Sequence, residues 1–268
     1  MKLLKKLMAC ITALAVMVPI LVSCDLSGTN GTQDSSKNIE NAAEVILDTT
    51  PYVATTVTIF TSDDPDMEDA IAGLRASEIV LSYDGTNTSV SLREAIGTAT
   101  VDKLYTLVGD TLYASTTLAV GDSSATAKKQ ATVDSAARDM ILTVTGSAMN
   151  LDCDDFTDRK TVSGDFTTVT CSNITPAALV SLEYIYSKDI EAAGAALEAS
   201  NVIYSFTVND GKYTEASITA SFKVTMNGVE YTFDMTTCTS YAYPEEVVIN
   251  APVNANEYVV VTYDEIMK

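Results

Sequence analysis

The sequence predicts an α+β protein whose main sheet is antiparallel and has one apolar face. The pair Asn227-Gly228 is a strong two-residue turn signal, and the residues on both sides of it alternate between apolar and polar types. In the segment 175–199, apolar residues instead recur every three or four positions, which is the period of an amphipathic helix. A hairpin and a helix that each have one apolar side are expected to pack against each other.

Residues 35–48 are predicted to form a short helix that precedes a series of strands. Ser35, Ser36 or Asn38 can cap this helix, and apolar residues follow at helical spacing. Strands are predicted at 52–60, 78–83, 89–92, 103–108 and 112–120, with turns at 84–85 and 109–110. The intervening segment 63–76 fits either a helix that begins at its proline or an acidic loop.

Two further helices are predicted in the second half of the chain. The first begins at Asp134 or Ser135 and runs through Val144. The second covers 175–199, and its apolar stripe consists of Leu179, Leu182, Tyr186, Ile190, Ala193 and Leu197. This second helix is the expected cover for the apolar face of the hairpin.

The two-residue turn also fixes which residues of the hairpin face each other. Phe222 is expected to face Phe233, and Val224 is expected to face Tyr231. The apolar face then comprises Ile218, Ala220, Phe222, Val224, Met226, Val229, Tyr231, Phe233 and Met235, with Thr237 as its polar member. The other face of the hairpin is polar, so it is expected to contact water.

Residues 1–23 are expected to be a secretory signal that is removed. Three lysines and no acidic residue flank an apolar run over 7–22, which as a helix is about 24 Å long and too short for a hydrocarbon core of about 30 Å. The run ends in LVSC at 21–24, which resembles a bacterial lipobox. In lipoproteins with this motif a diacylglycerol is attached to the cysteine, so the resemblance implies lipid attachment at Cys24. The alternative is an ordinary secretory signal that contains a cysteine.

The expected mature protein is a lipid-anchored domain on the outer face of the cell membrane. Residues 24–38 are the lipidated cysteine and a polar, glycine-containing tether, and 39–268 are a single domain. Removal of 1–23 takes away three lysines and no acid, so the net charge changes from −20 to −23. Because bacterial membrane surfaces are anionic, the domain is expected to stand away from the bilayer and to contact it through the lipid.

Composition and motifs exclude several classes of function. The chain has 36 Asp and Glu against 16 Lys and Arg, which disfavours a nucleic-acid partner. It has no His, so the most common general base and transition-metal ligand are absent. It also lacks a GxSxG motif, a P-loop and a dinucleotide-binding glycine motif. We therefore expect a non-enzymatic protein without a cofactor.

Three segments together resemble a known family. They are GKYTEASITASFKVTMNGVEYTFDMTT at 211–237, VVINAPVNANEYVVVTYDEIM at 247–267, and the capped helix before them. They look like small bacterial lipoproteins of the lipoprotein-carrier (LolA-like) fold, which include anchored proteins of Gram-positive bacteria. The resemblance implies a curved, unclosed antiparallel β-barrel, or half-barrel, with helices covering its concave face. Some relatives hold acyl chains in that concave face.

The resemblance and the apolar hairpin face together indicate a candidate site for a hydrophobic, acyl-chain ligand. The candidate lining residues are Leu182, Tyr186, Phe222, Val224, Tyr231, Phe233 and Met235. For each of them the alternative is an ordinary core position. The corresponding alternative function is a structural or protein-interaction lipoprotein of the cell envelope with a filled core and no ligand.

The cysteines and the acidic clusters leave alternatives open. Cys153 and Cys171 flank a turn signal, so they form either a cross-strand disulfide or two buried thiols, and strand alternation places Cys171 inward. Cys238 lies on the polar face of the hairpin. Acidic clusters at 63–69 and 152–158 fit either calcium ligands or solvated turns and helix caps. The second interpretation is preferred, so no metal site is predicted.

Overall fold

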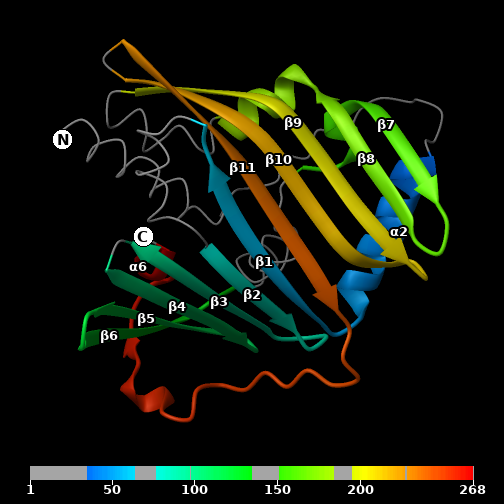
Figure 1. Cartoon of the computed structure of the whole chain (residues 1–268). Coiled ribbons are helices and arrows are strands. Elements are labelled where there is room, and N and C mark those ends of the chain that lie inside the picture. Colours follow the sequence, from blue (N-terminus) through cyan, green and yellow to red (C-terminus); the bar gives the residue numbers. More distant parts are fainter. Residues whose placement is uncertain are drawn as a thin grey trace.

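The computed structural model describes residues 35–63, 77–96, 98–134, 151–183, 195–226 and 228–267. These residues form one twelve-stranded sheet and a few short helices (Figure 1). No helix within these ranges is both long enough and apolar enough to span a membrane.

The first half of the chain contributes one helix and six strands. They are α2 (Ser35–Thr49), β1 (Tyr52–Thr61), β2 (Ser77–Tyr83), β3 (Thr88–Ile96), β4 (Ala99–Val108), β5 (Thr111–Val120) and β6 (Ser123–Thr132). The predicted helix and the five predicted strands are confirmed. Strand β6 was not predicted, because its sequence SSATAKKQAT has no large apolar residue and most of its side chains are exposed.

The second half of the chain contributes the remaining strands. They are β7 (Phe156–Ser163), β8 (Thr167–Ile174), β9 (Ala195–Asn209), β10 (Lys212–Met226), β11 (Val229–Ala242) and β12 (Val259–Val260). A 3₁₀ turn, η2 (Cys153–Asp155), precedes β7, another, η3 (Ala255–Glu257), precedes β12, and the short helix α6 (Tyr263–Met267) ends the described chain.

The strands follow the order β12-β6-β5-β4-β3-β2-β1-β11-β10-β9-β8-β7. All neighbouring strands are antiparallel except β12, which runs parallel to β6. Strands β1 and β11 lie in the middle, with β2–β6 on one side and β7–β10 on the other (Figure 1). The edge strands β7 and β12 do not pair with each other, so the sheet is unclosed, as predicted.

The hairpin register predicted from the Asn227-Gly228 turn is confirmed. Phe222 pairs with Phe233, and the regular pairing extends from Met226↔Val229 to Glu215↔Ser240. Gly228 has a φ of +77°, which is a left-handed conformation that glycine adopts without steric strain. The turn thus sets the alignment of the two long central strands.

The predicted helix over 175–199 is wrong in its last part. Residues 176–183 are helical, but Leu197 and Ala199 lie in β9, where they pair with Val224 and Phe222 of β10. The segment AALEAS at 195–200 also alternates with period two, and pairing with β10 decides in favour of the strand. Tyr186 and the rest of 184–194 lie outside the described residues, as do the predicted helix from residue 135 onward and residues 64–76.

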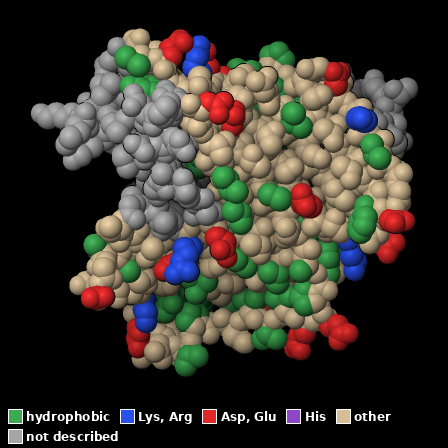
Figure 2. All heavy atoms as spheres, in the orientation of Figure 1, with side chains coloured by type: hydrophobic (Ala, Val, Ile, Leu, Met, Phe, Trp, Pro, Cys, Tyr) green, Lys and Arg blue, Asp and Glu red, His purple; other side chains and the backbone are tan. Residues whose placement is uncertain are grey.

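The main hydrophobic core lies on one face of β1 and β8–β11. Ala43 and Leu47 of α2 and Leu182 of the 176–183 helix belong to it. Helix α2 lies behind the β7–β10 side of the sheet in the view of Figure 1. Over β8–β11 the face toward the viewer is mostly neither hydrophobic nor charged, with single hydrophobic and acidic side chains scattered over it, whereas hydrophobic side chains gather in the lower part of the same view (Figure 2). A smaller second core joins β4–β6 to Ile266 of α6.

Candidate ligand-binding face

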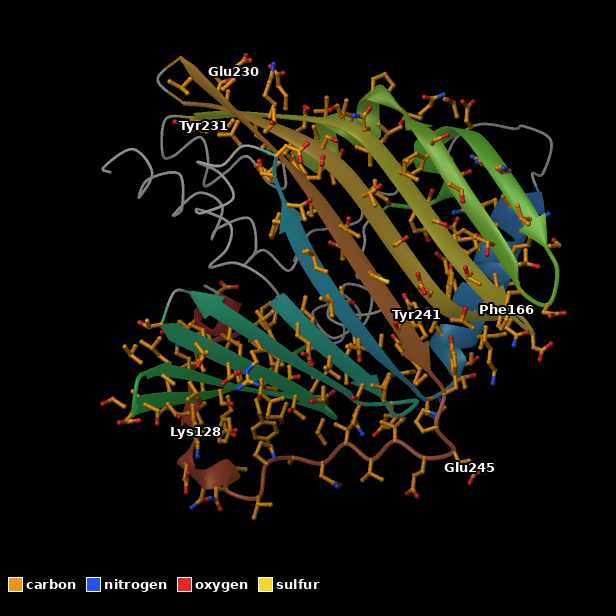
Figure 3. All side chains as sticks on the ribbon, viewed as in Figure 1. Lys128, Phe166, Glu230, Tyr231, Tyr241 and Glu245 are labelled. Atoms are coloured by element: carbon orange, nitrogen blue, oxygen red, sulfur yellow. The ribbon has the colours of Figure 1, made fainter. Side chains whose placement is uncertain are left out.

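Most of the predicted lining residues lie in the main core. Leu182, Phe222, Val224, Phe233 and Met235 are each at most 5 % exposed. Tyr231 is only partly buried and lies near the tip of the β10–β11 hairpin (Figure 3). The structure therefore brings six of the seven predicted residues into the main core or against it, five from β10 and β11 and Leu182 from the 176–183 helix, and the seventh, Tyr186, lies outside the described residues.

The phenylalanine rings of this face pack directly against one another. The rings of Phe222 and Phe233 are stacked with centroids 5.4 Å apart, and Phe60 of β1 meets Phe233 edge-on at 6.0 Å. Both distances lie in the range of favourable aromatic pairs. These side chains thus contact one another along one face of β1, β10 and β11, and little of their surface reaches water.

A second group of aromatic residues forms a continuous chain at the other end of the same face. Phe156, Tyr204, Phe206, Tyr213, Tyr241, Tyr52 and Tyr83 follow one another with ring centroids 5.5–6.3 Å apart. Tyr241 marks this end in Figure 3. Burial raises the pKa of Tyr204, Tyr213 and Tyr241 above the ordinary value for tyrosine, because the charged phenolate would lose its hydration. The sequence did not indicate this chain of rings, because its members come from six separate strands.

One buried and one partly buried pair of hydroxyl groups lie between the two aromatic groups. The hydroxyls of Thr56 and Thr239 are 2.8 Å apart, and those of Thr58 and Thr237 are 3.0 Å apart. Each pair links β1 to β11 and satisfies the hydroxyls internally. Thr237, the polar exception predicted from the hairpin pattern, is therefore partnered within the sheet.

A buried carboxylate links α2 to the 3₁₀ turn η2, which precedes β7. Glu40 is 1 % exposed, and its carboxylate accepts a hydrogen bond from the Cys153 backbone N–H at 3.0 Å. Lys37 lies 3.2 Å from the same carboxylate and 3.0 Å from Asp152. Burial alone would lower the pKa of Lys37, but Glu40 and Asp152 raise it. The lysine therefore stays charged and offsets the buried negative charge.

Two acidic residues of the 152–158 cluster, Asp152 and Asp155, serve as caps. The Asp152 side chain accepts from the Asp154 N–H at 2.6 Å, and the Asp155 side chain accepts from the Asp152 N–H at 3.0 Å. This reciprocal arrangement is a capping box at the start of η2. Within the described ranges no group of three or more His, Cys, Asp or Glu side chains is arranged to hold a metal ion. Residues 64–69 of the other cluster lie outside those ranges.

The two inner cysteines lie side by side in the core. Their Sγ atoms are 3.2 Å apart, and both residues are 0 % exposed. The inward position predicted for Cys171 is confirmed. Cys238 lies on the opposite, polar face of the hairpin, opposite Ser217, and is partly exposed.

One part of the inner face of the sheet carries exposed apolar side chains. Along β5, Leu112 and Ala114 are buried against the second core, whereas Leu118 and Val120 on the same face are 47 % and 51 % exposed. Val101 of β4 pairs with Leu118. Sequence reasoning missed this patch, because alternation alone does not show where the cover over a strand ends.

Comparison with known proteins adds no assignment. No family model matches the chain, and no curated protein matches it. Cys24, the expected lipid attachment site, lies outside the described residues.

Proposed function

We propose that this protein is a non-enzymatic lipoprotein that is held on the outer face of the cell membrane by a lipid on Cys24. The proposal is supported by the order of basic residues, apolar run and LVSC motif at the start of the chain. It is also supported by the polar stretch 25–34 that separates Cys24 from α2. The membrane contact in this proposal is the lipid, and the folded domain carries a strong negative charge.

We further propose that the domain acts as a structural or protein-interaction component of the cell envelope. The observation that supports this choice is the burial and mutual contact of Phe60, Phe222 and Phe233 on the face predicted to line a ligand cavity. In this proposal the buried side chains pack against one another and against the helices, so the face is part of the hydrophobic core and not a binding cavity. Helices α2 and 176–183 act as its cover in this proposal, as in the half-barrel of the LolA-like resemblance.

A second candidate function is binding of an acyl chain at the exposed part of the inner face. Leu118 and Val120 favour it, because they extend the apolar face of β5 beyond its buried part and keep about half of their surface in contact with water. An apolar ligand laid along β4 and β5 would remove that surface from water, which is favourable by about 25 cal/mol per Å².

The anchor is tested by metabolic labelling of the full chain with an alkyne fatty acid in a bacterial host. The wild-type chain is expected to carry the label and to partition into detergent, and Cys24→Ala is expected to lose both properties. Cys10→Ala is the matched control, because Cys10 lies within the apolar run of the signal and is expected to leave labelling intact. Equal labelling of the wild type and Cys24→Ala would contradict the proposal.

The ligand candidate is tested with the Cys24→Ala chain, which carries no lipid of its own, by titration of a fluorescent fatty acid. Leu118→Asp is expected to abolish saturable uptake if the exposed inner patch is the site. Leu104→Asp is the matched control, because Leu104 is exposed on the outer face of the adjacent strand β4. Absence of saturable uptake by the parent chain would reject this second candidate.

A further inference from the structure

The strongest unassigned feature is the pair of cysteines beneath α2. The Sγ atoms of Cys153 and Cys171 are 3.2 Å apart, so the two sulfur atoms contact each other directly. Both residues are fully buried, and they belong to different elements, η2 and β8. We infer that Cys153 and Cys171 form an intramolecular disulfide in the mature protein and that Cys238 remains a free thiol.

Hydrogen bonds hold each cysteine in place from both sides. The Cys153 N–H donates to the Glu40 carboxylate, and the Cys153 carbonyl accepts from Arg159 Nε at 2.9 Å. Cys171 lies in a central position of β8, paired with Arg159 of β7 and Tyr204 of β9. Because the surrounding fold already holds the two thiols at contact distance, little further conformational entropy is lost when they form a bond.

The remaining cysteine has no comparable partner in the part of the chain that the structure describes. Cys238 lies on the outer face of β11 and pairs across the strand with Ser217 and Val57. The two inner cysteines lie on the core side of the sheet. The odd cysteine of the folded domain is therefore Cys238, and the fold itself selects which two thiols pair.

The oxidant is a low-molecular-weight or protein disulfide. The inference rests on the proposed extracytoplasmic location in one respect, because that location supplies such a disulfide. One protein thiolate attacks a sulfur of this disulfide, which gives a mixed disulfide and releases one reduced thiol. The second thiolate then attacks the protein sulfur and displaces the second reduced thiol. The two protein thiols thereby give two electrons to the oxidant, and their two protons end on the released thiols.

The bond would fasten the anchor point of α2 to the sheet. Cys153 donates to Glu40 of α2, so a covalent link from Cys153 to β8 fixes the turn that holds the helix. The hydrogen bond with Cys171, followed by burial, raises the pKa of the Cys153 thiol, so exchange in the folded protein is slow. The bond is therefore expected to form as the fold brings the two thiols together and before their burial is complete.

The test refolds the purified full chain from reduced denaturant in a buffer of reduced and oxidised glutathione. Free thiols are then blocked with N-ethylmaleimide in denaturant, and the digest is read by mass spectrometry. The expected result is a linked pair of peptides containing Cys153 and Cys171, with the maleimide on Cys238. Maleimide on both inner cysteines, or any link through Cys238, would overturn the inference. The state of Cys24 is read from a separate peptide, so failure of the lipid anchor is distinguished from failure of the disulfide.

Thermal unfolding gives a second readout that does not depend on digestion. The link closes a loop of 18 positions, so reduction is expected to lower the melting temperature by roughly 6–12 °C. Cys153→Ala, Cys171→Ala and the double variant are expected to melt alike and to lose the response to reductant. Cys238→Ala is the matched control and is expected to retain that response. A wild-type melting temperature that does not change on reduction would overturn the inference.

Discussion

Truncation of Phe233 tests whether the face predicted to bind a ligand is a packed core. Phe233 is 2 % exposed, its ring stacks on Phe222 at 5.4 Å, and it meets Phe60 at 6.0 Å. Removal of a ring that is enclosed in this way loses the free energy of burying its apolar surface and leaves a cavity. Phe233→Ala is therefore expected to lower the free energy of unfolding by about 3–5 kcal/mol, which corresponds to a melting temperature lower by roughly 6–20 °C.

The assay is urea unfolding of the Cys24→Ala chain, followed by far-UV circular dichroism because the chain has no Trp. Thr232→Ala is the matched control, since its side chain is exposed on the other face of the same strand, and it is expected to change stability by less than about 0.5 kcal/mol. A double-mutant cycle with Phe222→Ala should give a coupling energy of roughly 0.5–1.5 kcal/mol. If Phe233→Ala changed stability no more than the control does, the ring would face open space and the packed-core interpretation would be refuted.

Three further predictions concern other parts of the fold. Glu40→Ala is expected to lower the free energy of unfolding in urea by roughly 1–3 kcal/mol, because the buried Cys153 N–H loses its acceptor; the same loss for the exposed Asn41→Ala would contradict this reason. Burial raises the pKa of Tyr243 to about 12 in the folded protein, against about 10 in the unfolded chain. The stability that the neutral Tyr243 hydroxyl contributes is therefore complete below about pH 10, and it is lost as the pH rises from about 10 toward about 12. Urea unfolding that showed constant stability between pH 9 and about 11.5 would refute that prediction. Ile266→Ala is expected to cost about 2–5 kcal/mol in thermal or urea unfolding, because Ile266 is 8 % exposed in the second core; an unchanged transition would show that α6 does not stabilise β4–β6.

The parts of the fold that were predictable are those fixed by neighbours in the sequence. The Asn227-Gly228 turn determines the pairing of β10 and β11, because a two-residue turn permits one register and period-two alternation then assigns each side chain to a face. Helix α2 and strands β1–β5 likewise follow from local periodicity and turn dipeptides. The apolar face with Phe222 and Phe233 was therefore identified correctly.

The parts that were missed depend on contacts between distant segments. Leu197 and Ala199 fit the end of an amphipathic helix as well as a strand, and pairing with β10 decides between the two. Strand β6 is polar along most of its length and is held by its pairing with β5. The hydrogen bond between Glu40 and Cys153 links residues 113 positions apart, so no local sequence pattern predicts it. The burial of the predicted binding face is also a property of tertiary contacts.

Native mass spectrometry of the Cys24→Ala chain, purified without detergent from the exported fraction, tests the central claim most directly. A face filled by its own side chains predicts the mass of the polypeptide alone. A stoichiometric acyl ligand that remains bound in Leu118→Asp would contradict the claim, because a ligand held away from Leu118 would have to displace the packing around Phe60, Phe222 and Phe233, which are at most 4 % exposed.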